Sequence, residues 1–126
     1  MESTRTKNDV IDLTPIVAAF EEQWIHAHGL SQVHGRAVLG GSVLTVVLEN
    51  AMSQAELALG KNPVSSALLA RYVDQLVDLI YPALAHSVES VLHQHVTGTG
   101  VNVDAEIGCV VFTIHLDVAG PLGGEW

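Results

Sequence analysis

Residues 62–96, NPVSSALLARYVDQLVDLIYPALAHSVESVLHQHV, decide the fold of this chain. Asn62 supplies a helix cap and Pro63 a first helical residue, and apolar residues then recur at helical spacing. The recurring residues are Leu68, Leu69, Tyr72, Val73, Leu76, Ile80, Leu84, Val88, Val91 and Leu92. The pattern predicts one long helix, on the order of 45–50 Å from the rise per residue. Pro82 removes a backbone donor inside it, so we expect a kink between Asp78 and Pro82 or two helices meeting there.

A β-hairpin is expected before the long helix. Residues 33–39 and 43–49 both read as extended segments. The pair Gly40-Gly41 lies between them and can supply the positive φ angles of a tight turn. In the second segment Leu44, Val46 and Leu48 share one face, so one side of this hairpin is strongly apolar.

Two shorter helices are indicated by their caps. Thr14 reads as an N-cap followed by Pro15, and apolar residues then recur at helical spacing until Gly29. A capping box is expected in the segment after the hairpin, where Ser53 and Glu56 stand three residues apart. The helix that Ser53 starts should end at Gly60.

The last third of the chain again reads as extended. Val101 and Val103 match Ile107 to Leu116 across a short turn, which predicts a second hairpin. The run Thr97-Gly98-Thr99-Gly100 reads as a connection from helix to strand. The sequence therefore predicts an α+β fold in the order α-β-β-α-α-β-β. Its two β-hairpins form a four-stranded, mostly antiparallel sheet, and the long helix packs on one face.

Length and composition favour one packed domain. The chain has 126 residues, of which 48% are hydrophobic and 15% charged, a mixture typical of a globular protein. We expect a flexible lead-in over residues 1–12, a single α+β domain over 13–118 and a flexible tail over 119–126 that ends in Trp126. The only cysteine, Cys109, lies in an apolar run and is expected to be a small buried residue.

The charge balance limits the partners that the surface can bind. The formal net charge is -9, which repels nucleic-acid backbones and anionic lipid. No stretch reaches 18 consecutive apolar residues, and the N-terminus lacks the apolar core of a signal peptide. The sequence therefore predicts a cytoplasmic protein that binds no nucleic acid and does not insert directly into a membrane.

Seven histidines raise the question of a metal site. His86, Glu89 and His93 are spaced on one face of the long helix, with His95 close by in sequence, and this set can meet one divalent metal ion or serve a haem. The preferred interpretation is a solvated stripe opposite the apolar one. His26 and His28 at the end of the first helix are read as capping residues near the negative end of the helix dipole.

No pair of residues reads as a catalytic couple. Glu49 and Glu56 resemble an acid–base pair, but Glu56 already has a place in the capping box. No nucleophile stands beside a base, so a non-enzymatic role is favoured.

The long helix also predicts self-association. It presents apolar residues on more than one stripe, and a four-stranded sheet can cover only one of them. We expect a homodimer or larger assembly, held through the long helix or an edge strand.

Several local motifs resemble the MpsC family, a family of small bacterial proteins long described as a domain of unknown function. The resemblance rests on the segment LENAMSQAELAL, on the start of the long helix and on VNVDAEIGCVVFTI. In that family a strand ends in a pattern of Leu, Leu or Met, Thr or Ser, and Glu, ahead of a long helix that carries an Arg. The matching residues here are Leu48, Met52, Ser53, Glu56 and Arg71. The segment HAHGLSQVHGRAV departs from the family's Gly-Lys-Gly-Pro-like segment, so no role of that lysine is carried over.

The resemblance implies a role beside a membrane system that generates a sodium-linked membrane potential or takes up inorganic carbon. It supplies no catalytic residues. The expected function is a non-enzymatic accessory or regulatory protein-interaction domain with a membrane transport protein as a possible partner. The alternative is a metal- or haem-binding protein that uses the histidine-rich helix face.

Overall fold

The computed structural model describes residues 11–30, 32–104 and 106–117. The predicted lead-in and tail, including Trp126, fall almost wholly outside the described residues. The elements follow in the order α2 (Thr14–His28), β1 (His34–Gly40), β2 (Val43–Glu49), α3 (Gln54–Leu59), α4 (Pro63–Leu92), β3 (Val96–Asp104) and β4 (Cys109–Leu116). This order confirms the predicted α-β-β-α-α-β-β arrangement.

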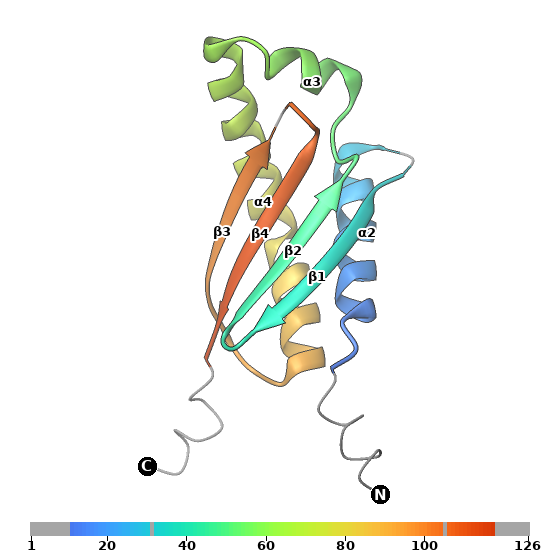
Figure 1. Cartoon of the computed structure of the whole chain (residues 1–126), viewed down its shortest axis with the longest axis vertical. Helices are drawn as coiled ribbons and strands as arrows, with labels where there is room; N and C mark the ends of the chain where they lie inside the picture. The colour runs from blue at the N-terminus through green and yellow to red at the C-terminus, as the bar shows by residue number, and fades with distance from the viewer. Residues whose placement is uncertain (1–10, 31, 105, 118–126) are drawn as a thin grey trace, which may run out of the picture.

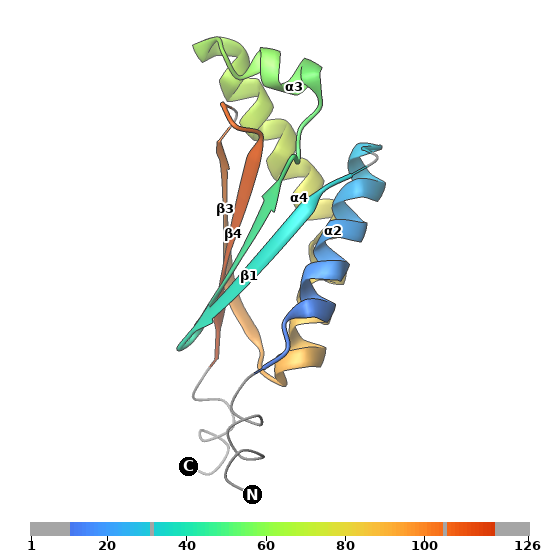
Figure 2. The ribbon, with the colours of Figure 1, turned by 45° about the vertical axis from the view of Figure 1, so that its right-hand side comes forward.

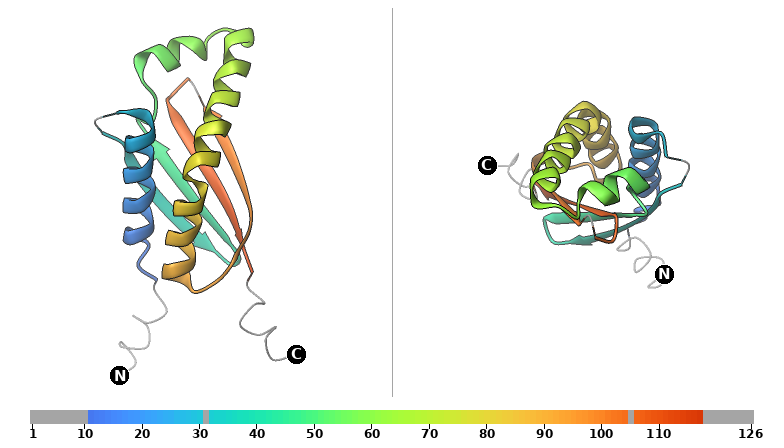
Figure 3. Two further views of the ribbon diagram at one scale, coloured as in Figure 1. Left: turned by 180° about the vertical axis from the view of Figure 1, so that it is seen from behind. Right: turned by 90° about the horizontal axis from the view of Figure 1, so that it is seen from above.

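The four strands form one sheet in the order β1-β2-β4-β3, with every neighbouring pair antiparallel (Figure 1). Figure 2 shows α2 and α4 on the same side of this sheet, and the view from above in Figure 3 shows helices and sheet as two layers. The α+β fold with its long helix on one face is therefore confirmed. The short helix α3 and the start of α4 extend past the ends of the strands.

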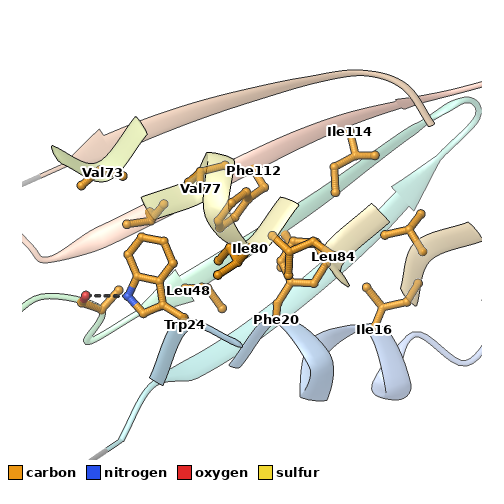
Figure 4. Close-up of a cluster of buried hydrophobic side chains, with 14 of the residues drawn as sticks. Ile16, Phe20, Trp24, Leu48, Val73, Val77, Ile80, Leu84, Phe112 and Ile114 are labelled. Carbon is orange, nitrogen blue, oxygen red and sulfur yellow. Dashed lines mark hydrogen bonds between the residues drawn. The ribbon is translucent and has the colours of Figure 1, made fainter. Parts of the chain in front are cut away.

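The core fills the space between the two layers. Phe20 and Trp24 of α2 both meet Phe112 of β4 edge-on, with ring centroids 5.2 and 6.0 Å apart. The Trp24 indole donates to the carbonyl oxygen of Ala51 at 2.8 Å, so its one polar atom is satisfied (Figure 4). The other buried residues of this core include Ile16, Leu44, Val46, Leu48, Val73, Val77, Ile80, Leu84, Val88, Val110, Ile114 and Leu116.

Gly35 allows α2 to lie close against β1. A Cβ atom at this position would lie 2.9 Å from Cγ1 of Val17, so any larger residue would force Val17 or the backbone to shift. The Gly35 N–H also donates to the Glu21 carboxylate at 2.7 Å. Helix and strand are thus joined by both a steric fit and a hydrogen bond.

The long helix is continuous. The expected alternative of two helices meeting near Pro82 is wrong, because α4 runs unbroken from Pro63 to Leu92 with Pro82 inside it. Asn62 caps its start as predicted, accepting from the Val64 N–H at 2.8 Å. The helix ends earlier than the sequence pattern suggests, since His93 adopts a left-handed conformation with φ 57°.

Three further boundaries differ from the sequence prediction. The run from Thr97 to Gly100 belongs to strand β3 and is not a connection. Gly40 is the last residue of β1 and pairs with Val43, so only Gly41 of the two glycines has a positive φ, at 60°. Thr14 is the first residue of α2, not its cap, and its N–H donates to the Asp12 carboxylate at 3.0 Å.

Candidate interaction site at the junction of α2, α3 and α4

The start of α3 is held by the predicted capping box. The Ser53 hydroxyl accepts from the Glu56 N–H at 3.2 Å, and Oε1 of Glu56 accepts from the Ser53 N–H at 2.8 Å. The N–H groups of Ser53 and Glu56 are therefore satisfied reciprocally. The capping box is confirmed.

Glu56 has a second partner that lies 28 residues earlier in the chain. Its Oε2 lies 2.8 Å from Nε2 of His28, the last residue of α2. The two side chains are only 2% and 10% exposed, so this contact is made away from water. Because an ionised carboxylate only accepts hydrogen bonds, Nε2 is the nitrogen that donates.

Aromatic rings enclose the His28 imidazole. Trp24 stacks on it with centroids 4.4 Å apart and an interplanar angle of 22°. Tyr72 of α4 meets its edge at 6.0 Å. The remaining nitrogen, Nδ1, is buried and has no hydrogen-bond partner within the part of the chain that the structure describes. Ser53 is bonded to backbone rather than to this imidazole, so Ser53, His28 and Glu56 do not form a nucleophile–base arrangement.

A shallow pocket opens above this cluster, and its outer walls are apolar. It is lined by His28, Ser53, Glu56, Leu59, Leu68, Leu69 and Tyr72. Several of these side chains belong to a larger exposed surface that continues along α4. We call this surface the apolar stripe, and it consists of Leu59, Val64, Leu68, Tyr72 and Leu79. Val64 and Leu79 are 75% and 77% exposed, so the stripe is open to solvent.

The predicted metal-ligand set does not converge at the end of α4. Oε2 of Glu89 accepts from the Val96 N–H at 2.9 Å and lies 3.8 Å from Nδ1 of His95. His86 contacts Ser90 at 3.4 Å, and His93 lies just past the helix end. Among the described residues, no three His, Cys, Asp or Glu side chains gather closely enough to hold a metal ion. The metal or haem hypothesis stays a prediction, and this geometry gives it no ligand set.

The other residues singled out from the sequence lie apart from this cluster. Glu49 pairs with Arg36 at 2.8 Å on the exposed side of β1 and β2. Arg71 is exposed on α4, and His26 is exposed on α2. Cys109 is buried as expected. Its burial is the main cause that raises the pKa of its thiol, and the negative charge of Glu49 adds to it.

Sequence reasoning identified both halves of the His28–Glu56 pair but not their contact. The sequence pattern places His28 at the end of one helix and Glu56 at the start of another, each for a local reason. The available signal is a capping glutamate with one carboxylate oxygen left over, together with a histidine one helical turn after Trp24. Neither feature indicates that the two helix ends meet.

Comparison with known protein families now places the chain. The family described as "Na+-translocating membrane potential-generating system (MpsC)" matches residues 15–118. The chain belongs to the MpsC family. The match runs from the first turn of α2 to just past β4, so the two layers of this MpsC domain and the His28–Glu56 junction all lie inside it. No curated protein and no solved structure matches the chain significantly. Within the described residues, no helix combines the length and the apolarity that crossing a membrane requires.

Proposed function

We propose that this MpsC protein is a non-enzymatic accessory or regulatory domain. It serves a membrane ion or inorganic-carbon transport system from the cytoplasmic side by binding other proteins. Membership of a family named for a sodium-translocating, potential-generating system supports the setting. The apolar stripe is the observation that carries the interaction role, because exposed contiguous apolar side chains on a folded domain mark binding surfaces.

The proposal includes a homodimer formed through the apolar stripe. The start of α4 extends past the ends of the strands. Val64 and Leu68, near that start, are exposed, and no other described element covers them. A second copy related by two-fold symmetry would bring the same apolar surface against it and bury both at once. The contact would be mainly aliphatic, with Tyr72 as its aromatic member.

Light scattering tests the dimer. We expect the full chain to have twice the 13.4 kDa mass of one copy at micromolar concentration. The double variant Leu68→Glu/Leu79→Glu should be a monomer with an unchanged circular dichroism spectrum, since both side chains are exposed. The matched control Ala18→Glu, at an exposed position on α2, should remain dimeric. A monomeric wild-type protein would refute the dimer.

The accessory role needs a measurement on membranes. In cells that lack the protein, we expect the Na+-driven membrane potential, read with a voltage-sensitive dye, to fall. Wild-type protein and Ala18→Glu should restore it, whereas Leu68→Glu/Leu79→Glu should not. Full restoration by the stripe variant would show that this surface does not carry the function.

A further inference from the structure

The edge of the sheet at strand β3 offers a binding surface separate from the apolar stripe. In the strand order β1-β2-β4-β3, strand β3 is an edge strand: among the described residues it pairs with β4 alone, and no described strand lies along its other side (Figure 1). An unpaired edge presents backbone N–H and C=O groups that a further strand can use. The register of β3 against β4 shifts between Val96 and Gly98. From Gly98 to Val103 the strand is regularly paired and carries no charged residue and no proline, two of the features by which proteins block such an edge.

A groove runs between this strand and α4. Its central part is lined by Asp74, Asp78 and Tyr81 of α4 and by Thr99 and Val101 of β3. A second depression continues along the same two elements toward the start of α4, where Asn102, Val103 and Asp104 form the wall on the sheet side. Val101 and Val103 are only half-buried, so α4 does not fully cover this margin of the sheet.

The charge of the groove selects the occupant. Four acidic residues line the two depressions: Asp74, Asp78, Asp104 and Glu106. The only other ionisable residue among the described lining residues is Tyr81. A second copy adding through the same edge would place these carboxylates near their own counterparts, which like-charge repulsion disfavours. A segment with Lys or Arg at alternate positions would instead direct its cations at Asp74 and Asp78 while its backbone pairs with β3.

We propose that the β3 edge and this acidic groove bind an extended, Lys- and Arg-rich segment of the membrane transport partner as a fifth strand of the sheet. This inference rests on the proposed function for the identity of the partner. Segments of membrane proteins that adjoin the bilayer on the cytoplasmic side carry an excess of Lys and Arg, which is the chemistry that the groove requires. The groove lies on the side of α4 that faces β3, whereas Leu68 and Leu79 are exposed to solvent, so dimer and bound segment are compatible.

Fluorescence anisotropy with three labelled peptides tests the binding mode. The first is a 12-residue peptide of alternating Lys and Val, the second has Glu in place of Lys, and the third keeps every Lys but replaces two central Val by Pro. We expect only the first to bind at micromolar concentration, with an affinity that falls as salt rises. Equal binding of the Glu peptide would overturn the charge selection. Equal binding of the Pro peptide would overturn strand addition, because proline cannot donate to the ladder.

Protein variants locate the site. Asp74→Asn/Asp78→Asn should weaken binding of the basic peptide roughly tenfold, as expected for two partly exposed ion pairs. The matched control Glu22→Gln, an exposed acidic residue on α2, should bind like wild type. Hydrogen exchange of the β3 amides should slow when the basic peptide is bound. Unchanged affinity in the double variant, or unchanged exchange in β3, would refute the site.

The two proposals fail in different assays. If Asp74→Asn/Asp78→Asn loses peptide binding while the Na+-driven membrane potential of the cells stays normal, the groove is a peptide-binding site, but the transport system does not depend on it. If cells that lack the protein have a disturbed potential but the wild-type protein binds none of the peptides, the accessory role is supported and strand addition is refuted.

Discussion

At the scale of single residues, Glu56 connects two parts of the chain that lie far apart in sequence. One carboxylate oxygen closes the capping box of α3 and the other meets His28 at the end of α2. Removal of this side chain leaves both the Ser53 N–H and the His28 ring without their partner. Buried polar groups that lose a partner are costly because water does not replace it.

Ser53→Ala and Glu56→Ala should therefore differ in stability. We expect Ser53→Ala to lower the free energy of unfolding by about 1 kcal/mol, the usual cost of a lost N-cap, and to leave peptide binding intact. Glu56→Ala should cost about 3 kcal/mol, since it also leaves a buried imidazole unpaired. Urea unfolding measures both values, with Glu22→Ala as an exposed control. Equal losses in the two variants would mean that the His28 contact adds nothing.

Cys109 gives a second expectation at this scale. Burial and the nearby charge of Glu49 raise the pKa of its thiol, so the folded protein keeps the proton where the unfolded chain releases it. This contribution to stability is complete below the ordinary thiol pKa of 9.0 and is lost as pH rises above that value. Urea unfolding from pH 8 to 10 should show a steeper decline for wild type than for Cys109→Ala. A thiol reagent should modify native Cys109 slowly, and rapid modification would contradict its burial.

At the scale of elements, α4 contains an internal proline without being interrupted. Pro82 is exposed and cannot donate to the helix ladder. Pro82→Ala should therefore raise the free energy of unfolding by about 1 kcal/mol or more. Pro63→Ala is the matched control, because proline suits the first helical position and its loss should give no gain. Thermal melts of both variants decide the matter, and a loss of stability in Pro82→Ala would show that the helix depends on the proline.

The C-terminal end of α4 also permits a test of the metal hypothesis. The Glu89 carboxylate already accepts a hydrogen bond from the Val96 N–H, and His93 lies beyond the last helical residue. We expect Zn2+ or haem to leave the melting temperature unchanged in both wild type and His93→Ala, because a ligand that binds the folded state raises it. A stoichiometric ion in protein purified without added metal, absent from His93→Ala, would instead establish the site.

Most elements could be predicted because they carry local signals. Asn62 with Pro63 and Ser53 with Glu56 mark helix starts by chemistry confined to a few neighbouring residues. The run from Thr97 to Gly100 failed this approach, since glycine and threonine show no apolar alternation and the strand exists only through its pairing with β4. The His28–Glu56 contact failed for the same reason, because it depends on how α2 and α3 meet in space. The sequence also could not predict the rotation of α4 about its own axis, which decides which of its faces packs on the sheet and which is exposed.

At the scale of the whole molecule, the described residues leave the apolar stripe and the acidic groove uncovered once the core is formed. The apolar stripe and the acidic groove lie on different sides of α4. One suits a second copy by apolar contact, and the other suits a cationic strand by charge. A dimer that binds one partner segment per copy would therefore present two equivalent sites.

Dimer formation should make stability depend on concentration. Since the folded dimer is favoured by mass action, the melting temperature should rise as protein concentration increases from micromolar to hundreds of micromolar. The variant Leu68→Glu/Leu79→Glu, which we expect to be a monomer, should melt at one temperature across the same range, while Ala18→Glu should follow wild type. Calorimetry at several concentrations provides the measurement. A concentration-independent melting temperature for wild type would exclude a dimer coupled to folding.

The central pairing of the sheet has a kinetic consequence. Strands β2 and β4 lie side by side from Val43 with His115 to Leu48 with Val110, so the paired residues are 62 to 72 positions apart in the chain. The two outer pairs are hairpins that can close early, whereas the central pair must bring the ends of a long loop together before its contacts stabilise it. We therefore expect the β2–β4 pairing, which joins α2 and its hairpin to the C-terminal hairpin, to be the slow step of folding.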